Sequence, residues 1–350
     1  MHRSLLELGE INPSSNLPEI IEYVDLESVK GTRLETPKKL HIESAPSRAK
    51  RLAQRGDIFY QTVRPYQKNN YYFNKKDINF VFSTGYAQIR PDEINGEFLF
   101  YKLQTQNFVN KVLRRSTGTS YPAINSKDLS KIKIKISKSF REQERIGILL
   151  KKMDDIITLE QEKYELLEEY KNYFIQNVFT YEHSTVKSLK EVASIATGKL
   201  NANAMDENGK YDFYTSGINK YKINEYAFEG PAITIAGNGA TVGYMHMTNG
   251  KFNAYQRTYV LQDFKINKHY LYYNIQKELP KKIHEESRTG SIPYIVMDML
   301  EDLPIYVVEE KLMNQFGDQL HEVDSILEKS SLRIKKVKKL KKFLLECLFI

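Results

Sequence analysis

The chain has 350 residues, 27% charged and 41% hydrophobic, a balance that is typical of globular proteins and excludes an intrinsically disordered chain. Lys and Arg outnumber Asp and Glu by 52 to 44, and the net charge of +8 favours an acidic partner, most commonly nucleic acid. The single cysteine excludes a disulfide framework, and no apolar stretch approaches the roughly 20 residues that span a bilayer, so we expect a soluble, cytoplasmic protein.

The first half combines a strand-rich region with one long helix. The segment TVRPYQKNNYYFNKK, residues 62–76, mixes cations with tyrosines and amides. Lysine and isoleucine alternate over 131–136, which predicts a strand. From 142 to 179 apolar residues recur every three or four positions without proline, which predicts a helix about 57 Å long.

The second half repeats this order of elements. It opens on LKEVASIATGK, residues 189–199, for which the first half shows no evident counterpart. Strand and turn patterns then alternate up to about residue 262. A second apolar stripe without proline, from 309 to 349, predicts a second long helix.

A glycine-rich loop, Gly237–Gly243, follows a predicted strand at 232–236 and could hold a phosphate group. It lacks the third glycine of a dinucleotide-binding fingerprint, because Val242 stands there, and it lacks the Gly-Lys-Ser/Thr of a P-loop. The residues that follow predict another strand and no helix whose N-terminus could face a phosphate. Asn238 and Gly239 instead predict a tight turn between two strands.

No other motif supports catalysis. The seven histidines and Cys347 show no metal-ligand spacing. Asp92 and Glu97 loosely resemble the carboxylates of a nuclease motif, but Leu99 stands where that motif has its lysine. We therefore expect a chain without a catalytic site, a metal or a cofactor of its own.

An internal duplication organises the whole chain. Residues 117–134 and 289–305 share their order of residues, with Pro122 matching Pro293, Ile124 matching Ile295, Leu129 matching Leu300 and Ile132 matching Leu303. The offset is 172 between Thr117 and Thr289, and 170 between Phe179 and Phe349. We predict a mixed α/β fold with an internal pseudo-twofold repeat, divided into residues 1–140, 141–180, 181–308 and 309–350, in which the two long helices form a coiled coil.

Both halves carry loops in which cations, amides and tyrosines are interleaved. Arg and Lys bind phosphates or guanine edges, Asn and Gln suit adenine, and tyrosine packs on sugars or bases. The candidate DNA-binding residues are Arg64, Tyr66, Lys68, Asn69, Asn70, Thr215, Ser216, Lys220, Asn238, Thr241, Tyr255, Gln256 and Arg257. Their presence in both copies favours a bipartite reader of a polymer.

The sequence resembles the DNA-specificity (S) subunit of type I restriction–modification systems over nearly the whole chain. In the first half the stretches that carry the resemblance are RGDIFYQTVRP, STGYAQIRP, STGTSYPAINSKDLSKIKI and the helix that begins EQERIGILLKK. In the second half they are LKEVASIATGK, YTSGINKY, FEGPAITIAGNGATVGYM and FNAYQRTYVL.

The resemblance implies a fold, partners and cofactors. Each globular part would be a target recognition domain that reads one half of a split site in double-stranded DNA. The two helices would pack antiparallel, fix the spacer between the half-sites and dock two methyltransferase subunits. S-adenosylmethionine would be bound by those subunits, and ATP and Mg²⁺ by a motor-nuclease subunit.

The charges of the two helices favour the opposite, parallel orientation. Glutamates of the first helix and cations of the second lie at corresponding positions of the repeat, which favours a parallel pair. Exposed ion pairs contribute only about 0–1 kcal/mol each, so we expect the antiparallel pair that the resemblance implies.

Two alternatives to a DNA-reading subunit remain open. One is a stand-alone nuclease or nucleotide-dependent enzyme that uses the Gly237–Gly243 loop. The other is a coiled-coil scaffold without any DNA preference.

Overall fold

The computed structural model describes residues 1–77, 79–178, 184–286 and 293–349. The chain divides into two compact units, residues 1–161 with 332–350, and residues 162–331. The repeated Thr289-Gly290 pair, Phe179 and the expected boundary between residues 180 and 181 lie outside the described residues.

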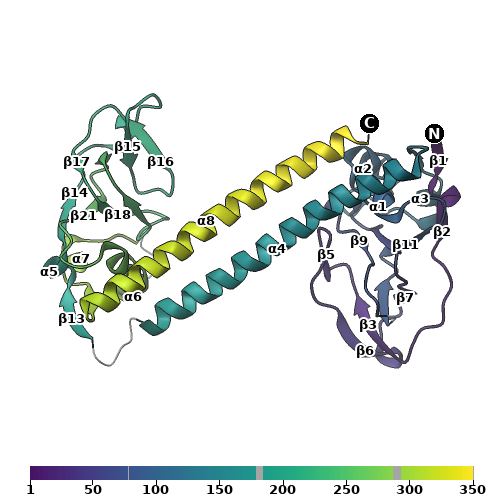
Figure 1. The fold of residues 1–350 in the computed structure, drawn as a ribbon, viewed down its shortest axis with the longest axis horizontal. Helices are drawn as coiled ribbons and strands as arrows, with labels where there is room; N and C mark the ends of the chain where they lie inside the picture. Colours follow the sequence, from purple (N-terminus) through teal and green to yellow (C-terminus); the bar gives the residue numbers. More distant parts are fainter. Residues whose placement is uncertain (78, 179–183, 287–292, 350) are drawn as a thin grey trace. The chain divides into compact units, whose positions relative to one another are not determined.

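The first unit contains two four-stranded sheets and two short strand pairs (Figure 1). One sheet has the order β2 (Gly9–Ile11), β11 (Tyr86–Pro91), β8 (Ile58–Gln61) and β9 (Tyr71–Tyr72). The other has the order β6 (Lys38–His41), β3 (Ile20–Val24), β10 (Phe80–Ser83) and β7 (Ala49–Leu52). The short pairs are β1 (His2–Ser4) with β12 (Lys133–Lys135), and β4 (Val29–Lys30) with β5 (Arg33–Leu34). Its helices include η1 (Leu5–Glu7), η2 (Ile42–Ser44), η3 (Pro65–Gln67), α1 (Gly96–Gln104), α2 (Gln106–Leu113) and α3 (Ser126–Ser130).

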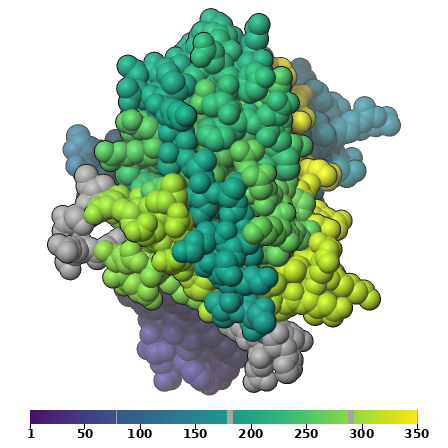
Figure 2. Space-filling view, turned by 90° about the vertical axis from the view of Figure 1, so that its left-hand side faces the viewer, coloured from purple at the N-terminus to yellow at the C-terminus, as the bar shows by residue number. Residues whose placement is uncertain are grey.

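In its described residues the second unit repeats this topology except for the β4–β5 pair. One sheet has the order β14 (Ser194–Thr197), β21 (Thr258–Gln262), β18 (Ala232–Ala236) and β19 (Met245–Thr248). The other has the order β16 (Lys220–Ile223), β15 (Tyr211–Tyr214), β20 (Lys251–Ala254) and β17 (Phe228–Glu229). A further pair joins β13 (Thr185–Ser188) to β22 (Pro304–Val307), and the helices include α5 (Leu189–Val192), η4 (Ala202–Ala204), α6 (Lys268–Glu286) and α7 (Met297–Glu301). Figure 2 shows the β13–β14 segment crossing one face of this unit.

The start of the first half corrects one expectation, because the lead segment of the second half does have a counterpart there. Ser4 and Glu7 form a capping box on η1, and Ser188 and Glu191 form the same box on α5. The amide of Leu5 donates to the carbonyl of Ile132 at 3.3 Å, as Leu189 donates to Leu303 at 3.0 Å. The match is also present in the sequence, because residues 4–11, SLLELGEI, and residues 188–195, SLKEVASI, share serine, leucine, glutamate and isoleucine at the same spacing.

Each unit contains one part of α4 (Phe140–Val178) and one part of α8 (Glu310–Cys347), so both long helices are confirmed. In the first unit Asp154 pairs with Lys341, and Glu160 with Arg333 at 2.8 Å, so residue numbers rise on one helix as they fall on the other. In the second unit Lys171 pairs with Asp324, and Phe174 packs on Phe316, so the numbers again run in opposite directions. The helices are therefore antiparallel in each unit, and the parallel pairing favoured by charge is wrong, because positions that correspond in the repeat do not face each other.

The residues that are buried on each long helix coincide only in part with the apolar residues whose spacing predicted the helix. On α8 the predicted Leu320, Val323 and Leu327 are buried. On α4, Leu150 and Ile157 are buried, whereas the predicted Leu149 and Ile156 are 43% and 37% exposed. The helix is apolar on more than one side, so spacing alone could not select the face that packs.

Candidate nucleic-acid interface

In the second unit three chain segments meet at the end of strand β18. The amide of Gly237 donates to the carbonyl of Arg257 at 2.8 Å, and the amide of Ile295 donates to the carbonyl of Gly237 at 2.8 Å. Asn238 forms an antiparallel bridge with Tyr294. These contacts enclose a pocket of about 400 Å³ whose polar lining includes Asn238, Gln256, Arg257 and Tyr294.

Side-chain hydrogen bonds tie a fourth segment to this site. The Ser216 hydroxyl donates to Asn238 Oδ1 at 2.6 Å, and the Thr241 hydroxyl donates to the carbonyl of Ser216. Arg257 is exposed and, within the described part of the chain, has no carboxylate within ion-pair distance. The site therefore offers one uncompensated guanidinium beside amide groups and an aromatic ring, a set of groups suited to base edges and phosphates.

The predicted tight turn at Asn238 and Gly239 is wrong in its detail. β18 and β19 do pair antiparallel, with Ile235 opposite Met245, so the connection between them runs from 237 to 244. Asn238 lies in the bridge with Tyr294, and the turn follows it, where the amide of Val242 donates to the carbonyl of Gly239. A strand and no helix follows the loop in the chain, whereas a nucleotide cradle leads directly into a helix N-terminus.

The same backbone pattern recurs in the first unit at the end of strand β8. Thr62 donates to the carbonyl of Gly85 at 2.9 Å and accepts from the amide of Ile124 at 3.0 Å, and Val63 bridges Ala123. Thr62 thus takes the place of Gly237, Val63 that of Asn238, and Gly85 that of Arg257.

The arginine of the two sites comes from different loops. Arg64 follows Val63 and has φ 53°, while Gly239, which follows Asn238, has φ 85°. The left-handed backbone is therefore kept at this position, with arginine in one unit and glycine in the other. The connection before β11 has Gly85 where the connection before β21 has Arg257. At this position the first unit therefore has glycine and the second unit has arginine. Each unit presents one arginine at the strand-end site.

Each arginine lies at a site with an exposed tyrosine that sequence reasoning missed. Arg64 Cζ lies 4.3 Å from the centroid of the Tyr121 ring, and Tyr121 is 63% exposed. Tyr294, which lines the pocket with Arg257, is 60% exposed. Tyr121 precedes Pro122 and Tyr294 follows Pro293, so the two tyrosines do not occupy equivalent positions of the repeat, although each adjoins its matched proline.

Several predicted residues of the first unit serve its internal structure. Asn70 is only 1% exposed, and its side chain accepts from the amide of Gln61 at 2.7 Å and donates to Gln104 at 3.3 Å. Asn69 Oδ1 accepts from the amide of Gly31 at 2.9 Å. Asn70 therefore cannot reach DNA in this conformation, and we leave it out of the proposed contact set.

The remaining predicted residues lie around the two sites. Tyr66 is 49% exposed, and Lys68 is half-buried, with its pKa lowered by burial and by the charge of Lys342. In the second unit the Thr215 hydroxyl accepts from the amide of Gly217 at 3.3 Å, and Lys220 lies 5.6 Å from the centroid of the Tyr214 ring.

Tyr255 has a mainly structural position in the second site. Its amide donates to the carbonyl of Tyr214 at 2.9 Å, and it forms a parallel bridge with Leu200. These bonds hold the connection between β20 and β21, so that Gln256 and Arg257 are presented from a fixed turn.

The described residues contain no group of three or more His, Cys, Asp or Glu side chains placed to hold a metal ion. Among the same residues, no helix is both long and apolar enough to cross a bilayer.

The chain belongs to the type I restriction–modification DNA specificity family, whose domain model matches residues 21–169 and 181–339. Among curated relatives, it is 34% identical to the specificity subunit of the EcoDI type I restriction enzyme of Escherichia coli over 43% of this chain and 33% of that protein. It is 23% identical to the MjaIX specificity subunit of Methanocaldococcus jannaschii over 66% of this chain and 63% of the relative. The chain thus spans about a third to two thirds of the length of these relatives.

The fold is that of a solved type I S subunit. The structure of the S subunit from M. genitalium superposes with a TM-score of 0.76 at 17% identity, covering 100% of this chain and 96% of that one. A second structure, from a study of complex assembly in the type I system, has a TM-score of 0.50 at 19% identity. The predicted mixed α/β fold with two repeats and two long helices is confirmed.

Proposed function

We propose that this chain is the non-catalytic, sequence-reading subunit of a type I restriction–modification complex and binds a split site in double-stranded DNA. One observation carries the proposal. The same strand-end site is built twice from the same backbone hydrogen bonds, and each copy combines an exposed tyrosine with an arginine, half-buried at Arg64 and exposed at Arg257. Because the arginine comes from a different loop in each copy, the two sites are expected to read different half-sites.

Residues 1–140 and 181–308 are proposed to act as the two recognition domains, with the helices of 141–180 and 309–350 fixing the spacer. The antiparallel contacts of α4 and α8 in each unit support this role. A stiff connection between two readers converts protein geometry into a defined half-site spacing.

Exposed apolar residues on the helices support docking of two methyltransferase subunits. Tyr170 and Tyr173 on α4 are 47% and 71% exposed, and Leu340 and Phe343 on α8 are 50% and 59% exposed. The two pairs are separated by 170 positions, so each unit carries one copy. Exposed apolar residues on a helix are typical of a protein interface, and two equivalent patches would suit two identical partners.

The chemistry of the complex is assigned to partners. S-adenosylmethionine is proposed to be held by the methyltransferase subunits, ATP and Mg²⁺ by a motor-nuclease subunit where one is present, and the complex to act in the cytoplasm.

The proposal is tested by expressing the chain with a methyltransferase encoded beside it and mapping methylated bases genome-wide. Methylation of a two-part motif with a fixed unspecified spacer is expected, together with co-purification of the two proteins. A complex that methylates no split motif would overturn the proposal, as would DNA cleavage or nucleotide binding by the isolated chain that Gly239→Val abolishes.

A further inference from the structure

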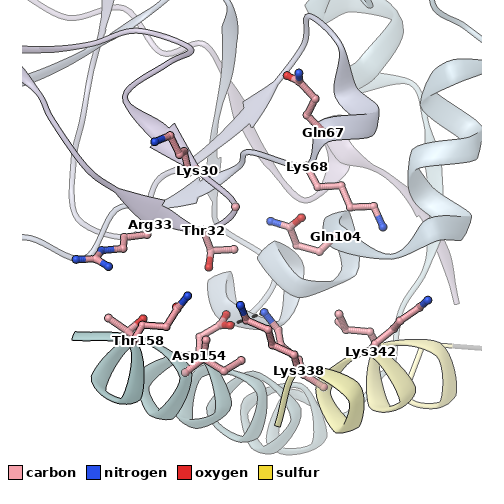
Figure 3. A pocket seen from close by; sticks show the side chains of 15 residues that line it. Lys30, Thr32, Arg33, Gln67, Lys68, Gln104, Asp154, Thr158, Lys338 and Lys342 are labelled. Atoms are coloured by element: carbon pink, nitrogen blue, oxygen red, sulfur yellow. Dashed lines mark hydrogen bonds and ion pairs between the residues drawn. The ribbon is translucent and has the colours of Figure 1, made fainter. Parts of the chain in front are cut away.

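The first unit contains a cation-lined pocket that lies beside the strand-end site and is not part of it. The pocket has a volume of about 390 Å³ and is bounded by the β4–β5 hairpin on one side and by α4 and α8 on the other (Figure 3). Its cationic lining consists of Lys30, Arg33, Lys68, Lys338, Lys341 and Lys342, against one carboxylate, Asp154. An adjoining pocket of about 430 Å³ shares Lys68, Gln104 and Lys342 with it.

The charges in these pockets are not balanced by the chain itself. Lys341 is neutralised by Asp154, and Lys30 by Glu35 at 2.7 Å. Within the described residues, Lys68, Lys338 and Lys342 have no carboxylate within ion-pair distance. Burial and then the charge of Lys342 lower the pKa of Lys68, while the carboxylate of Glu346 in the adjoining pocket acts in the opposite direction, so one positive charge of the two lysines is left for an anion to offset.

A buried hydrogen-bond donor lies between the two pockets. Gln104 is 5% exposed and lines both pockets, and its Nε2 has no hydrogen-bond partner among the described residues. Its Oε1 accepts from Asn70. Figure 3 shows the Gln104 amide directed into the space between the hairpin and the helix pair. An unsatisfied buried donor is costly, and because Nε2 is closed to solvent, a ligand oxygen would satisfy it once the side chain rotates toward either pocket.

The hairpin has a specific place in the repeat. It lies between β3 and β6, which correspond to β15 and β16 of the second unit, where the connection is only residues 215–219. That short connection carries Ser216, which bonds Asn238 at the second strand-end site. In the first unit the Gly31 amide bonds Asn69 Oδ1, so the hairpin is joined to the loop of Arg64 in a similar way.

We propose that this pocket binds a backbone phosphate of DNA next to the half-site read by Arg64, through Lys68, Lys342 and the Gln104 amide. This inference rests on the proposed DNA-reading function. Lysine suits a phosphate as a strongly charged point donor. In the described part of the chain, the pocket bounded by the hairpin has no aromatic ring in its lining on which a base could stack, and the adjoining pocket has only Phe349, which favours a phosphate over a whole nucleotide. The anchor is asymmetric, because the described residues of the second unit contain no counterpart of the hairpin.

The test uses the full chain and a duplex of random sequence, with affinity measured against KCl concentration. One double variant, Lys68→Gln/Lys342→Gln, removes two pocket lysines. A second double variant, Lys335→Gln/Lys339→Gln, is the charge-matched control on α8 outside both pockets. Each phosphate contact contributes about 0.9 to the slope of log K against log salt. The pocket variant should therefore lose more slope than the control, by about 1.

Gln104→Glu is a second variant, which keeps the oxygen that Asn70 contacts and replaces the unpaired donor with a charged acceptor. It should weaken DNA binding at least 10-fold while the thermal unfolding temperature stays close to that of the wild type. Because these comparisons use random DNA, they do not depend on whether the chain reads a split site.

Three results would overturn the phosphate anchor. The first is an equal slope for the pocket variant and its control. The second is an unchanged slope with lost methyltransferase binding, which would assign the pocket to a protein partner. The third is stabilisation of the wild type by millimolar pyrophosphate together with an unchanged DNA slope, which would assign it to a small phosphate ligand.

Discussion

Lys171 on α4 donates to Asp324 on α8 at 2.6 Å, and Asp324 also accepts from the Tyr273 hydroxyl at 2.7 Å. The first unit repeats this group with the helices exchanged, because Lys341 on α8 bonds Asp154 on α4, which accepts from Tyr101 at 2.9 Å. Burial, and then the adjacent carboxylate, raise the pKa of both tyrosines, so each phenol stays protonated as a donor. The repeat thus conserves a three-residue contact that joins each domain helix to both long helices.

Asp324→Asn should destabilise the second unit by about 1–2 kcal/mol, because it removes the charge that Lys171 and Tyr273 share at a half-buried position. Urea unfolding of the variant, of Lys171→Met and of the double variant gives the coupling between the two residues. Asp155→Asn is the control, since its pair with Lys151 is exposed on one helix, and it should cost less than about 0.5 kcal/mol. Additive effects of Asp324→Asn and Lys171→Met would contradict the coupling.

Gly317 of α8 lies against the start of α6, where a Cβ would come within 2.5 Å of the Tyr270 amide nitrogen and of Asn267 Oδ1. Gly147 of α4, 170 positions earlier, lies in the same way against Asn95 and Phe98. Gly317→Ala should therefore destabilise the protein by about 1–3 kcal/mol, despite the better helix propensity of alanine. Calorimetry would measure the change, with Lys335→Ala on the same helix as a control near zero. A stabilising Gly317→Ala would show that the helices do not approach this closely.

We expect His246 to lower the stability of the second unit in acid. Burial, and then the charge of Lys220, lower its pKa below the ordinary 6.5, and its ring packs on Tyr214 and Tyr244. The unfolded chain therefore binds a proton more readily, and stability falls as pH drops below about 6.5. His246→Phe should reduce the loss of unfolding free energy between pH 7.5 and 5.5. An identical pH dependence in the variant and the wild type would contradict the assignment to His246.

The sequence predicted the duplication and both long helices, because their apolar spacing and the constant offset are properties of the chain alone. It could not predict that Asn70 is buried, since its partners Gln61 and Gln104 come from a different strand and helix. Tyr121 and Tyr294 were missed because only the folded chain places them at the strand-end sites, Tyr121 beside Arg64 and Tyr294 in the bridge with Asn238. Glutamate and lysine runs suggested the wrong helix orientation, because flanking charges contribute little beside the buried face.

Seven residues added to α4 near Leu159, with seven added to α8 near Arg333, should lengthen the helix pair by about 10 Å, or about three base pairs of DNA. A seven-residue insertion approximately preserves the packed face. The methylated motif should keep both half-sites and gain about three unspecified positions. An unchanged spacer would remove the proposed role of the helices.

The central claim, that each unit reads one half of the site with its own arginine, is tested most directly by mapping the methylated motif of two variants. Arg64→Gly copies the glycine that the second unit has at this position, Gly239, and glycine also suits the left-handed backbone there. Arg257→Gly copies Gly85 of the first unit in the same way. Each variant is expected to relax base preference by roughly 10- to 100-fold in one half-site, a different half for each, and to leave the other half unchanged. Equal loss in both halves from either variant would contradict the claim.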